Sequence, residues 1–533
     1  MTIGLFLNGI AERPTIDRSE IMNAETKIER KVKKLGLKER YGHLTRDLGW
    51  ETSYQPMEKV FPFASYEGIK IHDWDAFEDP FRLTMDAYWK YQAEKERKLY
   101  AVIDSFAQNN GQMKITDARY VNALKIFLTG VSPLEYMAHR GYAHVGRHFV
   151  GAGPRVACQM QAIDELRHAQ TQMHTISHYN KYFDGLHDPR HMFDRVWYLS
   201  VPKSFFEDAM TAGPFEFLTA ISFSFEYVLT NLLFVPFMSG AAYNGDMATV
   251  TFGFSAQSDE SRHMTLGLEI IKFMLEQDAD NVPIVQRWID KWFWRGYRLL
   301  AIVAMMMDYM LPKRVMSWAE AWGIYFEEAG GALFEDLSRY GITTPKYADV
   351  ASKEKDRLTH EVWSTFYNYT HAAAFHTWIP NDDELAWLSE KYPATFDQLY
   401  RPRYEHWRAL QQKGERFYNN SLPQLCNVCQ IPMVFTEPDD PTKLCLRSTE
   451  FEGDKYHFCS DGCKDIFEFE PQKYIQSWLP VHQIFQGNCG GATMPEVLDW
   501  YNLKNGSDNL DYEGSPDQAI WNDWKTSAER ASG

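Results

Sequence analysis

The string Asp-Glu-x-Arg-His occurs twice in this chain, at residues 164–168 and 259–263. In each copy a His follows a Glu by three positions, and on a helix such residues lie on the same face. Each copy can therefore offer one carboxylate oxygen and one imidazole nitrogen to a single metal ion. Two copies predict two metal ions.

An isolated Glu precedes each copy at a similar interval, Glu135 before the first and Glu226 before the second. Average composition produces about one Glu-x-x-His by chance in a chain of this length. Two identical frames with matching upstream Glu residues are instead typical of a di-iron or di-manganese carboxylate bundle. The sequence therefore predicts a metal pair with six ligands: Glu135, Glu165, His168, Glu226, Glu260 and His263.

The types of ligand indicate the metal. Four carboxylates neutralise two Fe(II) ions, and two imidazoles without a thiolate favour iron or manganese over zinc or copper. We therefore predict two iron ions. The other charged residues of the two copies are Asp164, Arg167, Asp259 and Arg262. The Asp of one copy is expected to accept the free ring N–H of the His in the other copy, which would fix its tautomer. The alternative is a set of solvated helix charges.

Helices must position these ligands. Ser132 and Pro133 predict a helix that starts there and runs to about residue 150. Further helices are expected over about 154–180, over 204–238 with an interruption near Gly213 and Pro214, and over 246–275. The four Glu ligands then fall on successive helices. The predicted fold class is mainly α, with a ferritin-like di-iron four-helix bundle inside a larger helical body.

Apolar residues near the Glu ligands predict a substrate pocket with this wall: Val131, Leu134, Ala138, Phe205 and Phe225. Ordinary core packing is the alternative. Beside a metal pair, however, a dry pocket would exclude water and accept an apolar substrate. Thr230 lies one turn after Glu226, where its hydroxyl either bonds to the Glu226 carbonyl or relays protons at the centre.

Six of the seven cysteines follow residue 425, and four of them form two close pairs. The pairs are Cys426-x-x-Cys429 and Cys459-x-x-x-Cys463, which is the spacing of a tetrahedral zinc site that a reducing cytoplasm would keep as thiolates. We predict one structural zinc ion in a small β-containing module. Disulfide bonds are the alternative, and His457 could replace one cysteine as a ligand.

The chain of 533 residues divides into four predicted segments. Residues 1–90 are expected to dock or wrap, 91–414 to form the helical di-iron catalytic domain, 415–490 to form the zinc-binding module, and 491–533 to be an acidic extension. The net charge of −17 argues against nucleic acid as a partner. The most apolar stretch, residues 299–307, is too short to cross a membrane and predicts a buried helix. The N-terminus has no secretory pattern, so a cytoplasmic location is expected.

The doubled motif, the isolated Glu residues, Thr230 and the Cys-rich tail resemble the large subunit of bacterial multicomponent monooxygenases, over about residues 20–490. The likeness is greatest to phenol hydroxylase oxygenase components, with toluene monooxygenases next. It implies a di-iron subunit that uses O2 to convert phenol and methylphenols to catechols. Thr230 matches the family's active-site threonine, and Asn231 and Gln257 match residues that respond to a regulatory protein.

The resemblance also implies partners. Electrons would come from NADH through a separate reductase that carries FAD and a 2Fe-2S cluster. Two smaller subunits would join this chain in a dimer of heterotrimers, and a small cofactorless regulatory protein would bind it. The cysteine that methane monooxygenases carry near the pocket has no counterpart beside Glu135, which argues against methane as the substrate.

Other functions remain open from the residues alone. A toluene or other arene monooxygenase is the nearest alternative. A ribonucleotide reductase radical subunit uses a similar bundle but needs a redox tyrosine near one metal. Tyr136 and Tyr227 adjoin ligand Glu residues, yet adjacent helical residues diverge by about 100°. A ferroxidase or an assembly scaffold is the last class, which the chain length, the apolar wall and the zinc module disfavour.

Overall fold

The computed structural model describes residues 35–43, 66–183, 186, 199–313, 315–369, 377–415 and 425–476. The acidic extension predicted for 491–533 lies outside these residues, as does most of the docking segment predicted for 1–90. Residue 90 lies within the helix Met85–Gln108, residue 414 follows the helix Arg401–Lys413, and residue 490 lies outside the described residues. The division into four segments stays a prediction.

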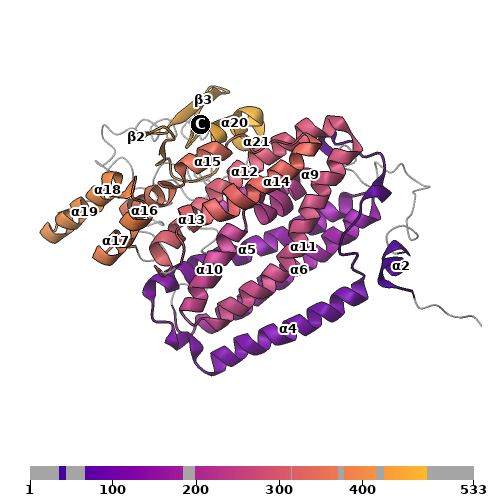
Figure 1. Ribbon diagram of the computed structural model, residues 1–533, viewed down its shortest axis with the longest axis horizontal. Helices are drawn as coiled ribbons and strands as arrows, with labels where there is room; N and C mark the ends of the chain where they lie inside the picture. Colours follow the sequence, from indigo (N-terminus) through magenta and orange to yellow (C-terminus); the bar gives the residue numbers. More distant parts are fainter. Residues whose placement is uncertain are drawn as a thin grey trace, which may run out of the picture.

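Helices dominate the described chain, as the sequence predicted. The long ones are α4 (Met85–Gln108), α5 (Ala118–His148), α6 (Ala152–Tyr179), α11 (Met247–Gln277) and α12 (Val282–Met305). Figure 1 shows α4 along the lower edge of the molecule, with α6 and α11 above it and the later helices above these. The shorter helices up to α11 are α2 (Leu37–Gly42), η2 (Tyr66–Gly68), η3 (Trp74–Ala76), η4 (Gly111–Lys114), α8 (Ser200–Met210), α9 (Pro214–Leu218), η6 (Thr219–Tyr227) and α10 (Asn231–Tyr243).

The chain beyond α11 forms further short helices, the earlier ones over the upper side of the bundle and those from residue 358 on at its left end (Figure 1). They are η7 (Ala279–Asn281), η8 (Met306–Met310), α13 (Trp318–Trp322), η9 (Gly323–Glu328), α14 (Ala329–Leu337), η10 (Ser338–Tyr340), α15 (Ala348–Glu354), α16 (Leu358–Tyr369), α17 (Asp382–Lys391), α18 (Phe396–Leu399) and α19 (Arg401–Lys413).

The first ligand helix begins earlier than predicted. α5 starts at Ala118, where the side chain of Asp117 accepts a hydrogen bond from the backbone N–H of Arg119, and Pro133 lies inside the helix. The prediction of a start at Ser132 is therefore wrong. A proline in a helix interior removes one backbone hydrogen bond and so disfavours the helix. Most of the residues around Pro133 are buried, and their packing outweighs this cost. Ser132 donates its hydroxyl to the Leu128 carbonyl instead of capping a helix.

Glu226 lies on a π-helical segment, η6, which joins α9 to α10. All of η6 except Tyr227 is buried. The sequence predicted an interruption only near Gly213 and Pro214, where α9 indeed begins with a proline in its first turn. Wide helical turns of this kind occur frequently at functional sites, and hydrophobic periodicity does not reveal them.

α11 approaches η6 closely at Gly267. A Cβ atom at this position would lie 2.5 Å from the backbone carbon and oxygen of Ser222 and 2.7 Å from the backbone nitrogen of Phe223. Only a glycine permits this contact, because the atoms that a side chain would meet belong to the backbone. The contact holds two ligand-bearing elements together, since α11 carries Glu260 and η6 carries Glu226.

The C-terminal module contains two antiparallel hairpins, β1 (Thr436–Glu437) with β2 (Asp440–Leu444) and β3 (Arg447–Phe451) with β4 (Asp454–Phe458), followed by α20 (Asp461–Phe469) and α21 (Pro471–Gln476). In the second hairpin Thr449 pairs with Tyr456. The module packs on α12: Trp294 donates its Nε1–H to the Ser460 hydroxyl at 3.1 Å, and Arg295 donates to the Val428 carbonyl at 2.7 Å.

Residues 299–307 are buried and helical, as predicted. Within the described ranges, no single helix has the length and apolar character needed to cross a membrane, although the pair Pro214–Tyr227 and Asn231–Tyr243, bent by 43°, would pass by length and composition.

The contact at Gly267 leads to a stability prediction. Gly267→Ala should lower the apparent melting temperature, because a methyl group there would push α11 away from η6, and overpacking costs about 1–3 kcal/mol. Gly331→Ala is the matched control: Gly331 is also helical, but nothing lies within 4 Å of its Cβ position. Differential scanning fluorimetry compares the two variants. Equal melting temperatures would contradict the packing described here.

Candidate metal centre

Four elements bring the six predicted ligands together in the buried interior of the bundle: Glu135 on α5, Glu165 and His168 on α6, Glu226 on η6, and Glu260 and His263 on α11. Their ligand atoms form two groups, and within each group all atoms lie within 4.8 Å of one another. Both groups contain Glu165 and Glu260. The arrangement suits two metal ions that share these two carboxylates.

Both imidazole rings turn Nδ1 toward the shared carboxylates. His263 Nδ1 lies 3.1 Å from a Glu165 oxygen and 3.4 Å from a Glu260 oxygen. His168 Nδ1 lies 3.5 Å from an oxygen of each of the same two residues. Among the described residues, neither Nδ1 atom has a hydrogen-bond partner, and Oε1 of Glu165 has none either. Buried polar atoms are normally satisfied, so metal ions between these atoms fit the donor set.

The other ring nitrogens make the crossed contacts expected from the sequence. His168 Nε2 lies 3.2 Å from Asp259 Oδ2, and His263 Nε2 lies 3.2 Å from Asp164 Oδ2. Both aspartates are fully buried, so they are not solvated helix charges. Because each Asp can hold the proton of the opposite ring on Nε2, each Nδ1 is left free to bind a metal.

Basic side chains surround the two aspartates. Arg167 lies 3.1 Å from Asp164 and 3.3 Å from Asp259, and Arg262 contacts Asp164. α4 adds Lys95, which pairs with Asp259. Such pairing is what permits two carboxylates to be buried near four others.

α4 makes a contribution that the sequence analysis missed. Gln92 donates from one amide nitrogen to Asp164 at 2.9 Å and to Asp259 at 2.8 Å, and the Tyr88 hydroxyl donates to Asp164 at 2.6 Å. One buried amide therefore joins the two motif copies. No motif marks these residues, because α4 lies far from both copies in the sequence.

Three more residues that the analysis missed touch the Glu ligands. Tyr142 donates to Glu226 at 3.0 Å, Gln161 donates to Glu226 at 3.2 Å, and Gln172 donates to Glu135 at 3.2 Å. Gln161 and Gln172 do carry a signal, because they lie four residues before Glu165 and four residues after His168 and so share the ligand face of α6.

The electrostatics of the site call for cations. Burial raises the pKa of Glu226 well above its usual value, and the charge of Glu260 adds to the rise. Burial likewise raises the pKa of Glu165 to about 7. Carboxylates that share a dry site do not ionise together without compensating charge. Two divalent cations supply that charge, which agrees with the donor set.

An apolar cavity of about 100 Å³ opens onto the carboxylates. Apolar cavities of roughly 150 Å³ are known to hold benzene, so this smaller space has room for one small ring at most. The residues that line it are Ile126, Phe127, Gly130, Val131, Leu134, Glu135, Ala138, Glu165, Leu199, Pro202, Phe206, Phe225, Glu226, Thr230, Leu233, Phe234, Glu260, Leu299, Ile302, Val303 and Met306.

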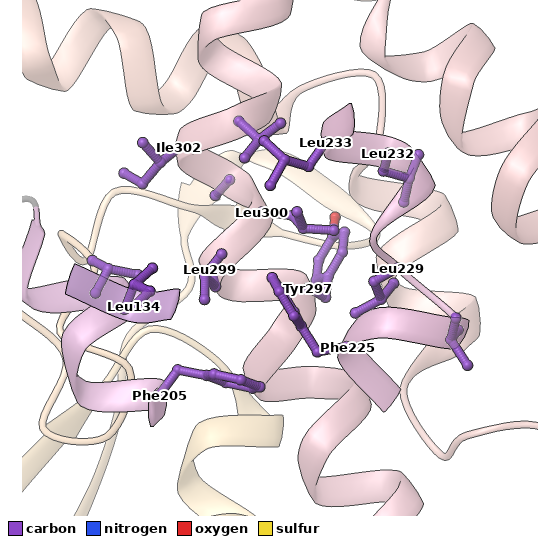
Figure 2. Close-up of a cluster of buried hydrophobic side chains, with 14 of the residues drawn as sticks. Leu134, Phe205, Phe225, Leu229, Leu232, Leu233, Tyr297, Leu299, Leu300 and Ile302 are labelled. Carbon is purple, nitrogen blue, oxygen red and sulfur yellow. The ribbon is translucent and has the colours of Figure 1, made fainter. Parts of the chain in front are cut away.

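Four of the five predicted wall residues line this cavity, and Phe205 does not. The ring of Phe205 packs against Phe225 at 5.4 Å and against Trp292 at 5.4 Å, while Phe206 takes its place in the wall. Neighbouring residues on α8 point in different directions, and the sequence did not reveal which one faces the metals. Figure 2 shows that α12 supplies a further part of the apolar cluster, through Leu299 and Ile302.

The three predicted catalytic residues divide into two groups. Thr230 is buried and lines the cavity beside Glu226. Gln257 donates from its amide nitrogen to the Asn231 side-chain oxygen at 3.3 Å, and both are only partly buried. Neither lines the cavity. Their hydrogen bond joins α10 to α11.

The tyrosines named as radical candidates, Tyr136 and Tyr227, have other surroundings. Tyr136 is 51% exposed, and Tyr227 stacks on Phe223. Tyr142, which was not among the candidates from the sequence, does contact the ligand Glu226.

The four predicted zinc ligands converge in the C-terminal module. Cys426, Cys429, Cys459 and Cys463 are buried free thiols whose sulfur atoms form one group. The Cys429 and Cys459 sulfurs are 3.6 Å apart, and those of Cys459 and Cys463 are 3.7 Å apart. Four Zn–S bonds of about 2.3 Å in a tetrahedron separate the sulfurs by about 3.8 Å. A zinc ion therefore fits, the disulfide alternative is wrong, and His457 is not part of the group.

Comparisons with known proteins point to one family. A model of the methane/phenol/alkene hydroxylase family matches residues 50–278, and a YHS domain model matches residues 435–478. The phenol 2-monooxygenase oxygenase component of Pseudomonas sp. strain CF600 is 72% identical over 92% of this chain and 95% of its own length. The alpha subunit of the alkene monooxygenase oxygenase component of Xanthobacter autotrophicus is 27% identical over 89% of this chain and 96% of its own.

A crystal structure of phenol hydroxylase from Pseudomonas sp. OX1 superposes with a TM-score of 0.85 at 70% identity, covering 92% of this chain and 99% of that one. The crossed carboxylate and histidine centre and these similarities lead to one conclusion: the chain belongs to the methane/phenol/alkene hydroxylase family, a group of non-haem di-iron monooxygenases.

Proposed function

We propose that this chain is the di-iron catalytic subunit of a phenol hydroxylase, which converts phenol and methylphenols to catechols with O2 and electrons from NADH. One observation carries the proposal: the carboxylates of the centre themselves line an apolar cavity with the scale of one ring. A ring in this cavity lies against the metal ligands, and the apolar wall keeps water away from it.

The proposed ligands are Glu135, Glu165, His168, Glu226, Glu260 and His263. Two iron ions held there would activate O2. One atom of O2 would enter the ring, and the other would leave as water with the two electrons that NADH supplies. The side chains around them have other tasks. Asp164 and Asp259 keep each ring proton on Nε2, and Arg167 and Arg262 balance their charge. Thr230 would relay protons at the cavity wall.

The relatives are oxygenase components of multicomponent systems, which implies further subunits and a reductase. We infer a dimer of heterotrimers with two smaller subunits, a reductase that carries FAD and a 2Fe-2S cluster, and a small cofactorless regulatory protein. Asn231 and Gln257 would respond to that protein, and their mutual contact across α10 and α11 gives it a way to move those helices. Four zinc-ligating thiolates suit a cytoplasmic location.

Turnover by the reconstituted system tests the proposal. With 18O2, phenol should yield catechol that carries one labelled oxygen atom, and toluene should react more slowly. Glu165→Ala and His263→Ala should abolish the reaction, because each removes a ligand. Mass spectrometry of the product decides the outcome. Faster turnover of toluene would favour an arene monooxygenase instead, and full activity in either variant would remove that residue from the site.

The size of the cavity should set the choice between phenols. Ala138→Phe should lower kcat/KM for methylphenols relative to phenol by a factor of about 10 or more, since one methyl group in a tight apolar pocket is worth about 1–3 kcal/mol. Val131→Ala enlarges the same wall and should move the ratio the other way. Kinetics on phenol and each methylphenol isomer measure the ratio. No change in either variant would mean that the ring binds elsewhere.

Thr230 offers a separate test. Thr230→Val keeps the shape of the side chain but removes the hydroxyl, so more hydrogen peroxide should form per NADH consumed if this hydroxyl relays protons. Thr230→Ser should match the parent. If Thr230→Val couples NADH oxidation to catechol as well as the parent does, the hydroxyl has only a local structural role.

The proposed zinc ion should stabilise the C-terminal module. Cys459→Ser should lose one zinc per chain and lower the yield of folded protein, since structural zinc sites contribute folding free energy directly. Cys445→Ser is the control, because Cys445 is buried in the same module but lies outside the sulfur group. Metal analysis by mass spectrometry compares them. Full zinc in the Cys459→Ser protein would show that the ligands are assigned wrongly.

A further inference from the structure

A second histidine cluster lies away from the iron ligands, on the outer side of α4 and α6. His174 and His178 are four residues apart on α6 and therefore share one face of the helix. Asp104 reaches the same point from α4. The Asp104 oxygen Oδ1 lies 2.7 Å from His174 Nε2 and 3.2 Å from His178 Nε2, and the two Nε2 atoms are 3.4 Å apart.

The spacing of these atoms matches a metal site. Zinc binds imidazole nitrogen and carboxylate oxygen at about 2.0–2.2 Å in a tetrahedron, which separates neighbouring ligand atoms by about 3.3–3.6 Å. Of the three separations, 3.4 Å lies in this range and 3.2 Å lies just below it. The third is shorter because His174 forms a hydrogen bond with Asp104, and this bond contributes most to lowering the pKa of the carboxyl.

We propose that Asp104, His174 and His178 form a peripheral site for a divalent transition metal, with Zn²⁺ the best match. Two nitrogens and one oxygen suit zinc, cobalt, nickel or copper better than magnesium or calcium, which prefer oxygen ligands alone. The side chains of His174 and Asp104 are 33% and 42% exposed, so a cation can enter from solvent and keep a water molecule as its fourth ligand.

A metal at this site ties α4 to α6. The edge of the Tyr100 ring, also on α4, packs against the His174 ring at 4.9 Å and helps to orient it. Two to three turns earlier, α4 supplies Gln92 and Lys95 to the buried aspartates of the iron centre. A metal ion at the peripheral site would therefore hold α4 in place, and α4 is the helix that contacts the buried aspartates. This inference does not depend on the substrate proposed above.

Zinc binding to the iron- and zinc-loaded enzyme tests the proposal. After dialysis to remove loosely held metal, equilibrium dialysis with Zn²⁺ should find one further ion per chain in the parent. The double variant His174→Ala, His178→Ala should bind that ion at least about 100-fold more weakly. His72→Ala is the matched control, because exposed His72 lies 2.9 Å from an Asp278 oxygen but belongs to none of the metal-ligand groups found among the described residues. It should bind like the parent.

Asp104→Asn covers the case in which the double variant does not fold, because it keeps the size of the side chain and removes only its charge. It should weaken Zn²⁺ binding at least about 10-fold. As a spectroscopic check, Co²⁺ should give a visible spectrum of a nitrogen-ligated site in the parent and not in the double variant. Equal stoichiometry and affinity in the parent and the variants would overturn the proposal. So would displacement of Zn²⁺ by an equal concentration of Mg²⁺.

Discussion

The crossed hydrogen bonds between Asp164 and His263 and between Asp259 and His168 tie the two halves of the centre together. Each motif copy supplies the Asp that orients the His of the other, so neither half is complete alone. The same bonds leave both Nδ1 atoms facing the shared carboxylates of Glu165 and Glu260. α4 reinforces this link, because one Gln92 amide reaches both aspartates.

Charge is balanced in two layers around the centre, an inner layer of glutamates and an outer layer of ion pairs. The four inner glutamates carry four negative charges, which two divalent ions neutralise. In the outer layer Asp164, Asp259 and Glu96 face Arg167, Arg262 and Lys95. Buried carboxylates are stable only when each is paired in this way. The apolar cavity can therefore lie directly against the centre without leaving an uncompensated charge in its wall.

Side-chain types and spacing were enough to predict that the six ligands come together. Residues i and i+3 share a face of a helix, and this can be read from the sequence alone. The cysteine group and the buried stretch at 299–307 followed in the same way. Long-range contacts were not predictable: Tyr142, Gln92 and Lys95 reach the centre from elements that no motif connects to it. The start of α5 was not predictable because burial overrides the local preference of Pro133. The π-helical turn at Glu226 was missed because hydrophobic periodicity does not reveal such turns. Phe205 and Phe206 exchanged roles because apolar neighbours on one helix look alike in sequence.

The most direct test of the central claim is Mössbauer spectroscopy of the oxidised protein loaded with 57Fe, together with an iron count. Because both ligand groups share Glu165 and Glu260, two irons per chain should form one exchange-coupled pair, diamagnetic at low temperature. Magnetically isolated iron, or one iron per chain at full loading, would contradict a centre built from two linked halves.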